Sequence, residues 1–543
     1  MTDQRSSPDR SSDVDVIVVG AGFAGMYMLH RLRELGLATR VYEAGGDVGG
    51  TWYWNRYPGA RCDIESLDYS YSFSDELQQE WDWSERYAAQ PEILRYANHV
   101  AERFDLRRDI TFNTRVTAAQ YDDAGRRWVI ETDSGERVTA RFCVMALGCL
   151  SAAQVPQFPG RESFRGRTYH TGAWPHEPVD FSGQRVGIIG TGSSAIQMIP
   201  LVARQAAHLT VFQRTPNFSV PAQNRPLDPE AVRELKARYP AYRQELRESR
   251  SGYLSVLTPN SERSALEATP EEREREYMAR WQRGGFGLLA GFADLYTSRE
   301  ANDTAAEFVQ DRIREIVDDP DIAEMLLPRT YPIGTKRLCV DTDYYATYNR
   351  PNVTLVSIAQ EQIEALTPTG LRTSAAEYAL DSIVFATGYD AMTGALLKID
   401  IRGRKGLRLA DVWADGPQSY LGLSIAGFPN LFTITGPGSP SVLSNMLVSI
   451  EQHVAWIAGC LDFLHEREIA EIEARAEAQD AWCAHVDKLA DATLYPHANS
   501  WYMGANIPGK PRGFMPYVGG VGRYRSRCAE IAAAGYEGFA LSR

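Results

Sequence analysis

The chain has 543 residues, of which 44% are apolar, so it is long and apolar enough for roughly three or four packed domains. This composition excludes a disordered or fibrous protein. Its 57 Lys and Arg residues against 70 Asp and Glu residues give a net charge of −13, which disfavours binding to nucleic-acid phosphates and to anionic membrane surfaces.

The N-terminal sequence and the cysteines indicate a protein of the reducing cytoplasm. Residues 1–13 are polar and we expect them to be frayed, because they lack the apolar segment and cleavage site of a secretory signal. The seven Cys residues are scattered, unlike the dense, even sets of disulfide-stabilised domains. The apolar run at 14–29 is too short to span a membrane. We expect no membrane or nucleic-acid partner; the oligomeric state is not predicted, although a monomer is compatible.

A first nucleotide-binding signal lies in DVDVIVVGAGFAGMYMLHRL, which predicts a buried parallel strand, a glycine turn and a helix. Gly20 allows the turn, Gly22 lets the backbone approach a pyrophosphate, and Gly25 permits close packing of helix on strand. Glu43 ends the next predicted strand, TRVYEA, 23 residues after Gly20. A carboxylate at that place suits the free diol of a ribose.

A second copy of the pattern is GQRVGIIGTGSSAIQMIPLV, with Gly190 and Gly192 in the first two glycine roles and Ala195 as the small third residue. Arg214 ends the next predicted strand, LTVFQRTP, 24 residues after Gly190, and Thr215 follows it. A guanidinium suits a 2′-phosphate, so the second nucleotide is predicted to be NADP(H).

Two dinucleotides on one chain favour a flavin reduced by NADPH, and we assign FAD to the first unit. The segment DSIVFATGYD, residues 381–390, is interpreted as a strand on which the chain returns to the FAD domain. A disulfide reductase is disfavoured, because Cys143 and Cys149 are six residues apart on an apparent strand, about 20 Å if extended. Molecular oxygen is therefore the expected oxidant.

Between about Leu227 and Pro328 the sequence becomes charged and helix-forming. Helix starts are predicted at Asp228-Pro229 and at TPEE, residues 269–272, where Thr and Glu have capping-box spacing. This segment predicts a helical insertion within the second nucleotide unit, whose closing strands lie near 352–386.

Three further motifs complete the pattern. The first motif is FRGRTYHTGAWP in the linker 160–180, which contains Phe164, Gly166, His170 and Trp174. The second is GGTWYWNRYPGARCD, residues 49–63, and the third is SWYMGANIPGKPR, residues 500–512. The first is similar to the FxGxxxHxxxW fingerprint of type I Baeyer–Villiger monooxygenases, which are class B flavoprotein monooxygenases. The resemblance runs from about Val14 to the end of the chain.

The resemblance implies oxidation of a ketone by NADPH and O2 to an ester or lactone, through a peroxide on carbon 4a of the flavin. Arg337, in YPIGTKRLCVD, matches the arginine that the family places over the flavin, and Asp63 matches its carboxylate partner. An anionic peroxide held out of water needs a fixed cation, and a guanidinium does not discharge it by losing a proton. Arg337 and Asp63 are the expected catalytic pair.

The resemblance also implies which residues line the cofactors and the substrate. Residues expected at FAD are Gly20, Gly22, Ala24, Gly25, Glu43, Thr51, Trp52, Asp63, Tyr69, Val116 and Met446. Residues expected at NADP(H) are Gly190, Thr191, Gly192, Ser193, Ser194, Gln197, Arg214, Thr215, Lys336, Arg337 and Trp501. Residues expected at the substrate pocket are Ile64, Gln90, Cys149, Leu150, Pro440, Ser441, Val442 and Leu443. No metal site is expected.

The expected substrates are aromatic or linear ketones, with sulfides as further oxygen acceptors. Cys149 stands where we expect a polar amide and Val442 where we expect a smaller side chain, so the favoured ketone is open. Two other functions also stay open. One is a flavin monooxygenase that oxygenates nitrogen or sulfur, and the other is an NADPH oxidase or redox flavoprotein that oxygenates nothing.

The sequence thus predicts an α/β fold with two Rossmann-like dinucleotide-binding domains, an interleaved chain and a helical insertion. Residues 1–150 and 386–543 are assigned to the FAD domain, the latter with a C-terminal active-site loop. Residues 151–226 and 331–385 are assigned to the NADP domain, and residues 227–330 to the insertion.

Overall fold

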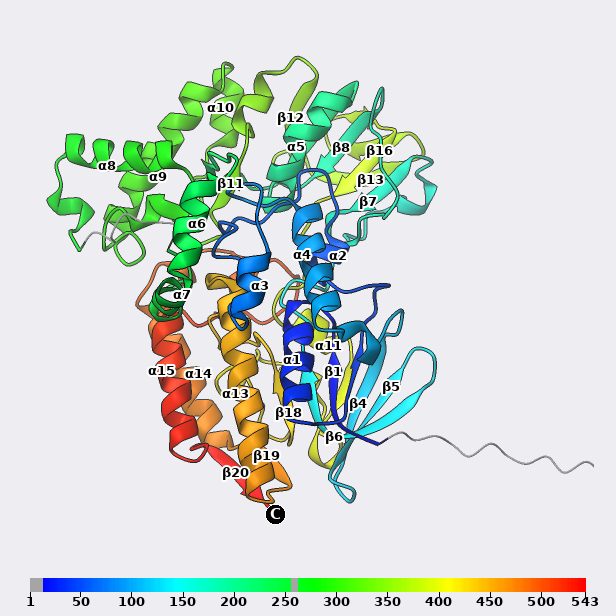
Figure 1. Cartoon of the computed structure of the whole chain (residues 1–543). Helices are drawn as coiled ribbons and strands as arrows, with labels where there is room; N and C mark the ends of the chain where they lie inside the picture. Colours follow the sequence, from blue (N-terminus) through cyan, green and yellow to red (C-terminus); the bar gives the residue numbers. More distant parts are fainter. Residues whose placement is uncertain (1–12, 255–261) are drawn as a thin grey trace, which may run out of the picture.

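The protein consists of two lobes built from one interleaved chain (Figure 1). The computed structural model describes residues 13–254 and 262–543, so most of the N-terminal segment that we expect to be frayed lies outside the described residues. The first lobe takes strands from both ends of the chain, and the second lobe comes from the sequence between them. This arrangement confirms the predicted α/β fold with two interleaved units.

The first lobe is built on an eight-stranded sheet in the order β17-β4-β5-β6-β1-β2-β3, with β18 paired to β6. The segment VDVIVV forms β1 and is buried from Val16 onward, as expected for a central parallel strand. The strands are β1 Val14–Val19, β2 Thr39–Tyr42, β3 Ile110–Thr111, β4 Val116–Asp122, β5 Arg127–Thr132, β6 Arg137–Met145, β17 Asp400–Arg402 and β18 Leu431–Thr433.

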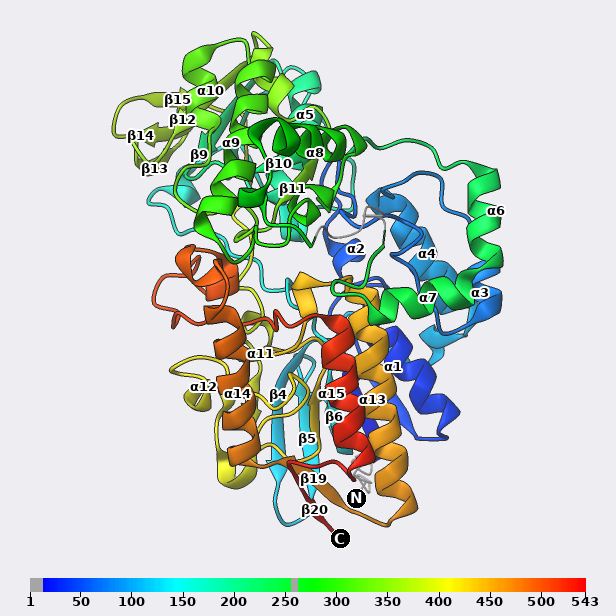
Figure 2. The same ribbon diagram turned by 90° about the vertical axis from the view of Figure 1, so that its left-hand side faces the viewer.

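Two long helices, α1 and α13, pack against each other beside this sheet (Figures 1 and 2). Helix α13 is long and apolar enough to cross a membrane, but 72% of its most apolar window is buried inside the protein, as in a core helix. The first-lobe helices are α1 Phe23–Glu34, α2 Thr51–Trp54, α3 Asp75–Glu80, α4 Gln90–Arg103, α11 Gly394–Leu397, α12 Leu409–Val412, α13 Met446–Glu466, α14 Ala476–Asp491 and α15 Val521–Ala533. Strands β19 Glu471–Ala474 and β20 Phe539–Ser542, which α14 and α15 separate in the chain, form an antiparallel pair of their own.

The second lobe is built on a fully parallel sheet in the order β12-β9-β8-β16-β7. Helix α5, Ser193–Gln205, follows the second glycine turn, and a small antiparallel sheet extends the lobe. The strands are β7 Arg167–His170, β8 Arg185–Ile189, β9 His208–Gln213, β12 Val353–Ser357, β13 Ile363–Thr367, β14 Gly370–Thr373, β15 Glu377–Ala379 and β16 Ser382–Phe385.

The predicted insertion is helical and reaches both lobes. Figure 2 shows α6 and α7 leaving the second lobe and lying beside α3 of the first lobe, while α8 to α10 stay with the second lobe. The short parallel pair β10 and β11 brackets the insertion. Its elements are β10 Ser219–Pro221, α6 Pro229–Ala237, α7 Tyr239–Glu248, α8 Pro270–Arg283, α9 Arg299–Ile316, α10 Pro320–Leu326 and β11 Cys339–Asp341.

Both helix starts predicted in the insertion are confirmed. Helix α6 follows Asp228, whose carboxylate accepts from the Glu230 backbone N–H at 2.9 Å. Helix α8 has the full capping box, because Thr269 Oγ1 accepts from the Glu272 N–H at 3.3 Å and the Glu272 carboxylate accepts from the Thr269 N–H at 2.9 Å.

Two strand predictions were too long. Residues 381–390 were expected to be one strand, but β16 ends at Phe385, because Gly388 has a φ of +78° and turns the chain toward the linker at Gln154. Strand β6 likewise ends at Met145, so Cys149 lies beyond it and the extended separation from Cys143 does not apply. All seven cysteines are nevertheless free.

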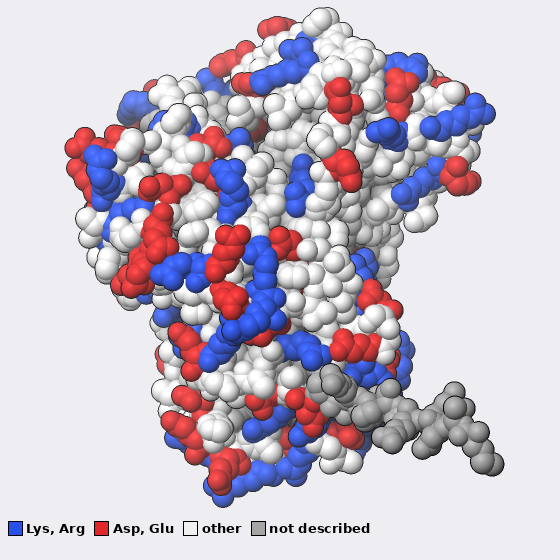
Figure 3. Space-filling model, turned by 45° about the vertical axis from the view of Figure 1, so that its right-hand side comes forward, with Lys and Arg blue, Asp and Glu red and all other residues white. Residues whose placement is uncertain are grey.

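Acidic and basic side chains are interspersed on the face drawn in Figure 3, with both signs present over each lobe. This mixture gives no large surface of a single sign on that face, and accords with the modest excess of acidic residues in the composition.

Candidate active site

The two glycine turns have the backbone that the sequence pattern predicts. Gly20 has a φ of +104° and Gly190 a φ of +111°, which other residues rarely adopt. A Cβ on Gly20 would lie 2.6 Å from the carbonyl oxygen of Ala146. A Cβ on Gly25 would overlap the carbonyl oxygen of Gly20, so this third glycine allows α1 to pack tightly on its turn.

Both turns fit the pyrophosphate of a dinucleotide. Helices α1 and α5 begin after Gly22 and Gly192, and neither has a side-chain cap or an acidic residue in its first turn. Their first backbone N–H groups are therefore available to an anion. A Cβ on Gly192 would meet no atom within 4 Å. Gly22 lies so close to Gly50 that a Cβ on Gly50 would lie 2.8 Å from the Cα atom of Gly22.

The residue after the second strand differs between the units. Glu43, after β2, is only 6% exposed, and its carboxylate accepts from the N–H groups of Ala21 at 2.7 Å and Gly45 at 2.6 Å. These bonds hold the acid against the first glycine turn, where the ribose of a bound dinucleotide lies.

Two cations meet at the second unit instead. Arg214, after β9, is exposed, and Lys336 is half-buried with its ammonium 4.4 Å from the ring centre of Tyr331. Burial, reinforced by the nearby Arg214, lowers the pKa of Lys336 to about 8. Two neighbouring cations make a site suited to a phosphate dianion.

Arg337 and Asp63 form a two-bond ion pair across the junction of the lobes. Arg337 precedes β11 and Asp63 lies in the loop between α2 and α3. Arg337 Nε donates to Asp63 Oδ2 at 2.9 Å and Nη2 donates to Oδ1 at 2.7 Å, while Nη1 donates to the carbonyl oxygen of Val442 at 2.9 Å. The guanidinium plane is therefore fixed from two sides.

Three aromatic side chains that the sequence did not predict surround this cation. The Arg337 guanidinium lies 4.8 Å from the ring centre of Phe286, and the phenols of Tyr253 and Tyr502 interact with its charge. Burial alone lowers the pKa of Arg337, but the charge of the Asp63 carboxylate outweighs it, so the pKa lies well above its ordinary value. Arg337 thus stays charged at every working pH.

Weak signals for these aromatics were present in the sequence. Phe286 follows Gly284 and Gly285 at the end of α8, and a glycine pair before an aromatic residue marks a place where the chain must turn tightly. Tyr502 follows Trp501, which was predicted to be at the nicotinamide nucleotide; their rings lie 4.2 Å apart in the turn Trp501–Met503.

The predicted substrate walls fall into two groups. Four of them pack in one apolar cluster that also contains Met446 and Trp501; these are Cys149, Leu150, Val442 and Leu443. Cys149 Sγ lies 2.9 Å from Ser441 Oγ. This contact connects the apolar cluster to the buried turn that begins with Pro440. Ile64 instead lines a small pocket with Asp63, and Gln90 Nε2 donates to the Trp52 carbonyl at 2.5 Å.

The remaining residues predicted at FAD lie on the first lobe. Trp52 Nε1 donates to the Tyr69 hydroxyl at 3.1 Å, and the Trp52 carbonyl accepts from Gln90. These three residues therefore form one hydrogen-bonded group. The others stand at the beginnings of separate elements; they are Ala24 in α1, Thr51 in α2, Val116 in β4 and Met446 in α13.

Among the residues predicted at NADP(H), Thr191 bonds within its own turn, whereas Gln197 bonds to residues of the first lobe. Thr191 Oγ1 donates to the Thr215 carbonyl at 2.9 Å within the second glycine turn. Gln197 Oε1 accepts from the Tyr57 hydroxyl at 2.8 Å, and its Nε2 donates to the Arg61 carbonyl at 3.1 Å, both in the first lobe. Of the two serines at the start of α5, Ser193 lies 3.4 Å from Cys339 Sγ and Ser194 3.5 Å from Thr171 Oγ1.

The fingerprint residues lie in β7 of the second lobe and on either side of it. A Cβ on Gly166 would overlap the ring of Phe164, so this glycine leaves room for the ring. His170 ends β7; its Nδ1 accepts from the Gly172 N–H at 3.0 Å and its Nε2 lies 3.2 Å from the Gln154 carbonyl oxygen. Burial lowers the pKa of His170, which favours the neutral ring.

Trp174 completes the fingerprint and is buried. Its ring stacks on Tyr169 of β7 at 5.2 Å, and its backbone N–H donates to the carbonyl of Trp54 in α2 at 3.3 Å. The fingerprint thus joins the second-lobe sheet to the first lobe.

Comparison with known proteins decides the family. The pattern of the pyridine nucleotide-disulphide oxidoreductases matches residues 17–250. A Baeyer–Villiger monooxygenase of Pseudooceanicola batsensis is 46% identical over 97% of this chain and 96% of its own length. The chain belongs to the Baeyer–Villiger monooxygenase family. A phenazine N-monooxygenase of Lysobacter antibioticus is 43% identical over 97% of both chains.

A solved structure agrees with this assignment. An oxidised steroid monooxygenase bound to NADP is 52% identical, with 98% of this chain and 100% of that chain covered and a TM-score of 0.93. The predicted family is therefore confirmed, and the protein is an FAD- and NADP(H)-dependent monooxygenase.

Proposed function

We propose that this Baeyer–Villiger monooxygenase converts a ketone, NADPH, O2 and a proton to an ester or lactone, NADP+ and water. The observation that carries the proposal is the two-bond ion pair of Arg337 and Asp63 at the junction of the two lobes. A fixed, permanently charged guanidinium at this place suits a reaction in which negative charge develops on oxygen.

When bound, FAD would supply the redox chemistry of the reaction, namely acceptance of hydride from NADPH and activation of O2. The residues that would hold it are the first glycine turn, Gly22 with Gly50, and Glu43 at the ribose. The second turn, Arg214 and Lys336 would hold NADP(H), with the two cations at the 2′-phosphate.

Arg337 has two tasks in the proposed reaction. Its charge stabilises the oxygen nucleophile and the tetrahedral adduct on the substrate carbonyl, since both are anions in a site of low polarity. Asp63 orients the guanidinium, and the Val442 carbonyl fixes its third nitrogen. The Phe286 ring lies 4.8 Å from the guanidinium and shields that side of it from water, which would protonate the nucleophile.

The proposed substrates are aromatic or linear ketones, with sulfides as further acceptors. The apolar cluster of Cys149, Leu150, Val442 and Leu443 offers a wall for an uncharged carbon skeleton. Because the steroid monooxygenase is 52% identical, a steroid ketone belongs in the first substrate panel. We also propose a cytoplasmic location and the domain boundaries given by the sequence, namely 1–150 with 386–543, 151–226 with 331–385, and 227–330.

Oxygenation of a ring nitrogen is the second candidate function. It is favoured by the phenazine N-monooxygenase that is 43% identical over 97% of both chains. Arg337 bound to Asp63 argues for the ketone reaction, because transfer of electrophilic oxygen to nitrogen needs no stabilised oxygen anion.

One experiment separates these functions. The FAD-loaded enzyme is supplied with NADPH under air and with phenylacetone, a steroid ketone, a sulfide or a phenazine, and NADPH loss, hydrogen peroxide and products are measured. Benzyl acetate from phenylacetone, or an ester from the steroid, supports the proposal. N-oxide without ester supports the second candidate, and hydrogen peroxide alone with every compound indicates an NADPH oxidase.

A further inference from the structure

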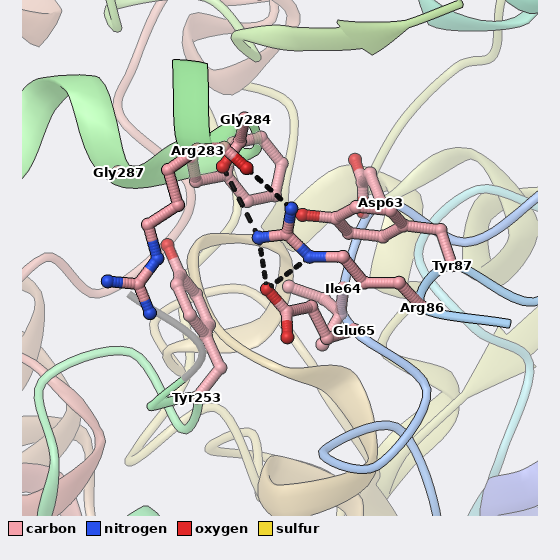
Figure 4. A pocket seen from close by; sticks show the side chains of 10 residues that line it. Asp63, Ile64, Glu65, Arg86, Tyr87, Tyr253, Arg283, Gly284 and Gly287 are labelled. Atoms are coloured by element: carbon pink, nitrogen blue, oxygen red, sulfur yellow. Dashed lines mark hydrogen bonds and ion pairs between the residues drawn. The ribbon is translucent and has the colours of Figure 1, made fainter. Parts of the chain in front are cut away.

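A buried arginine, Arg86, lines the same small pocket as Asp63, the partner of Arg337. It is only 5% exposed and is bound to Glu65 through Nε at 2.8 Å and Nη2 at 2.5 Å. Its terminal nitrogens also donate to three backbone carbonyls, those of Arg283 at 2.6 Å, Ala222 at 3.3 Å and Gly284 at 3.4 Å. Figure 4 shows the guanidinium between Glu65 and the end of α8. All five N–H donors are thus used.

The two arginines connect the same two stretches of chain. One stretch carries Asp63 and Glu65, two residues apart, and the other carries Gly284 and Phe286, also two residues apart. Arg337 lies between Asp63 and the Phe286 ring, while Arg86 joins Glu65 to Gly284. Asp63, Glu65, Arg86, Gly284 and Phe286 line one small pocket.

The turn that presents Phe286 has a backbone that needs support. Gly284 and Gly285 have φ values of +77° and +80°, and a Cβ on Gly284 would lie 2.6 Å from the Pro221 carbonyl oxygen. Two backbone bonds also hold this turn, from the Gly284 N–H to the Arg280 carbonyl at 3.0 Å and from the Gly285 N–H to the Pro221 carbonyl at 2.9 Å. The bonds from Arg86 to the carbonyls of Arg283 and Gly284 add two side-chain contacts that connect the turn before Phe286 to the Glu65 segment.

We propose that Arg86, held by Glu65, is a positioning residue for Arg337: it sets the separation between the Asp63 loop and the Phe286 turn, between which the Arg337 guanidinium lies. The proposal rests on the function proposed above for Arg337. Loss of Arg86 frees the turn at Gly284, lets the guanidinium of Arg337 leave the plane set by Asp63, and diverts oxygen from ester to hydrogen peroxide.

The test compares Arg86→Met with Arg33→Met in the FAD-loaded enzyme. Arg33 is a matched control, because it also binds a carboxylate, of Asp109, and two backbone carbonyls, of Phe104 and Asp105, at the far end of α1. For Arg86→Met we expect the ester formed per NADPH to fall about fivefold or more, with hydrogen peroxide making up the difference. The rate of flavin reduction by NADPH should stay within about twofold, and Arg33→Met should change neither value.

Amide hydrogen exchange gives a readout that does not depend on turnover. Peptides covering 283–290 and 334–340 should exchange about tenfold faster in Arg86→Met and at the wild-type rate in Arg33→Met. Unchanged exchange in both peptides together with wild-type coupling would overturn the proposal. Should Arg86→Met not fold, Glu65→Gln, which removes the charge of the partner and keeps its shape, is expected to give the same changes at smaller size.

A double variant tests whether Arg86 acts through the Phe286 turn. Phe286→Leu alone should lower coupling, and Arg86→Met added to it should lower coupling little further. Losses that multiply would show that Arg86 acts independently and would contradict the proposal. If the wild-type enzyme gives only hydrogen peroxide with every ketone, the proposed function fails, whereas the exchange data still decide whether Arg86 holds the turn.

Discussion

The two glycine turns share one backbone conformation. They differ in the charge of the side chains beside them and in whether their third position has room for a side chain. In the first unit an acid, Glu43, is bound to the turn and the third small position is Gly25, where a Cβ would overlap the Gly20 carbonyl. In the second unit the strand end bears Arg214 beside Lys336, and the third position is Ala195, fully buried with its Cβ accommodated. We therefore propose that the groups at the strand ends distinguish the two dinucleotides, while packing sets how closely each helix approaches its turn.

The largest effect expected from this comparison follows replacement of the third glycine. Gly25→Ala places a Cβ on a backbone oxygen that cannot move away, so we expect loss of about 3 kcal/mol or more of stability and failure to retain FAD. Ala195→Gly in the other unit should cost only about 1 kcal/mol, as Gly does in a helix. Thermal unfolding and the flavin absorbance of the purified variants measure both, and equal losses would remove the distinction.

The next effect concerns the ion pair where the two units meet. Arg337→Ala should leave flavin reduction by NADPH largely intact, because hydride transfer does not need this cation, but lower ester formation by about a hundredfold or more. Stopped-flow reduction and product chromatography measure the two halves separately. A normal ester yield from this variant would contradict the role given to Arg337.

Replacement of the second-unit cation tests the difference in charge directly. Arg214→Ala should raise the KM for NADPH by about tenfold or more and leave the KM for NADH nearly unchanged, because only NADPH carries the 2′-phosphate. Steady-state kinetics with both nucleotides measure the ratio. An equal rise for both nucleotides would mean that Arg214 does not bind the phosphate.

The smallest expected effect is a pH dependence that only the second unit should show. Lys336 has its pKa lowered to about 8, so it is charged and attracts phosphate below that pH and becomes neutral above it. The KM for NADPH should therefore rise about two- to fivefold between pH 7 and pH 9, because the bound 2′-phosphate favours the charged ammonium and raises the pKa of Lys336 above its value in the free enzyme. Lys336→Met should abolish the dependence, and the KM for NADH serves as the control; a rise that persists in this variant comes from another group.

Local patterns predicted much of the fold because their constraints act within one element or one supersecondary unit. The positive φ at Gly20 needs a glycine, the capping box at Thr269 needs bonds three residues apart, and Glu43 bonds to Ala21 within one strand–turn–helix–strand unit. The predicted strand at 381–390 was wrong after Phe385, because its end depends on Gly388 meeting a linker far away in sequence.

The candidate site was predicted only in part, because its residues come from segments that are distant in the sequence. Arg337 and Asp63 were named from motifs, yet neither motif contains the distance between them, which the docking of the two lobes provides. Phe286 and Tyr502 were missed, because an aromatic residue in a helical insertion or a loop looks like ordinary core until a cation is placed beside it.

The sequence by itself determined the two nucleotide units, the sign of charge that each presents, and the helical character of the insertion. Those features are local, since a backbone conformation or a strand-end side chain is specified by residues within about one turn or strand. Only the tertiary structure decided that Asp63, Phe286 and Val442, from three distant segments, enclose one guanidinium, with Arg86 holding two of those segments in place. Such contacts depend on how separately formed lobes pack, which no short stretch of the chain specifies.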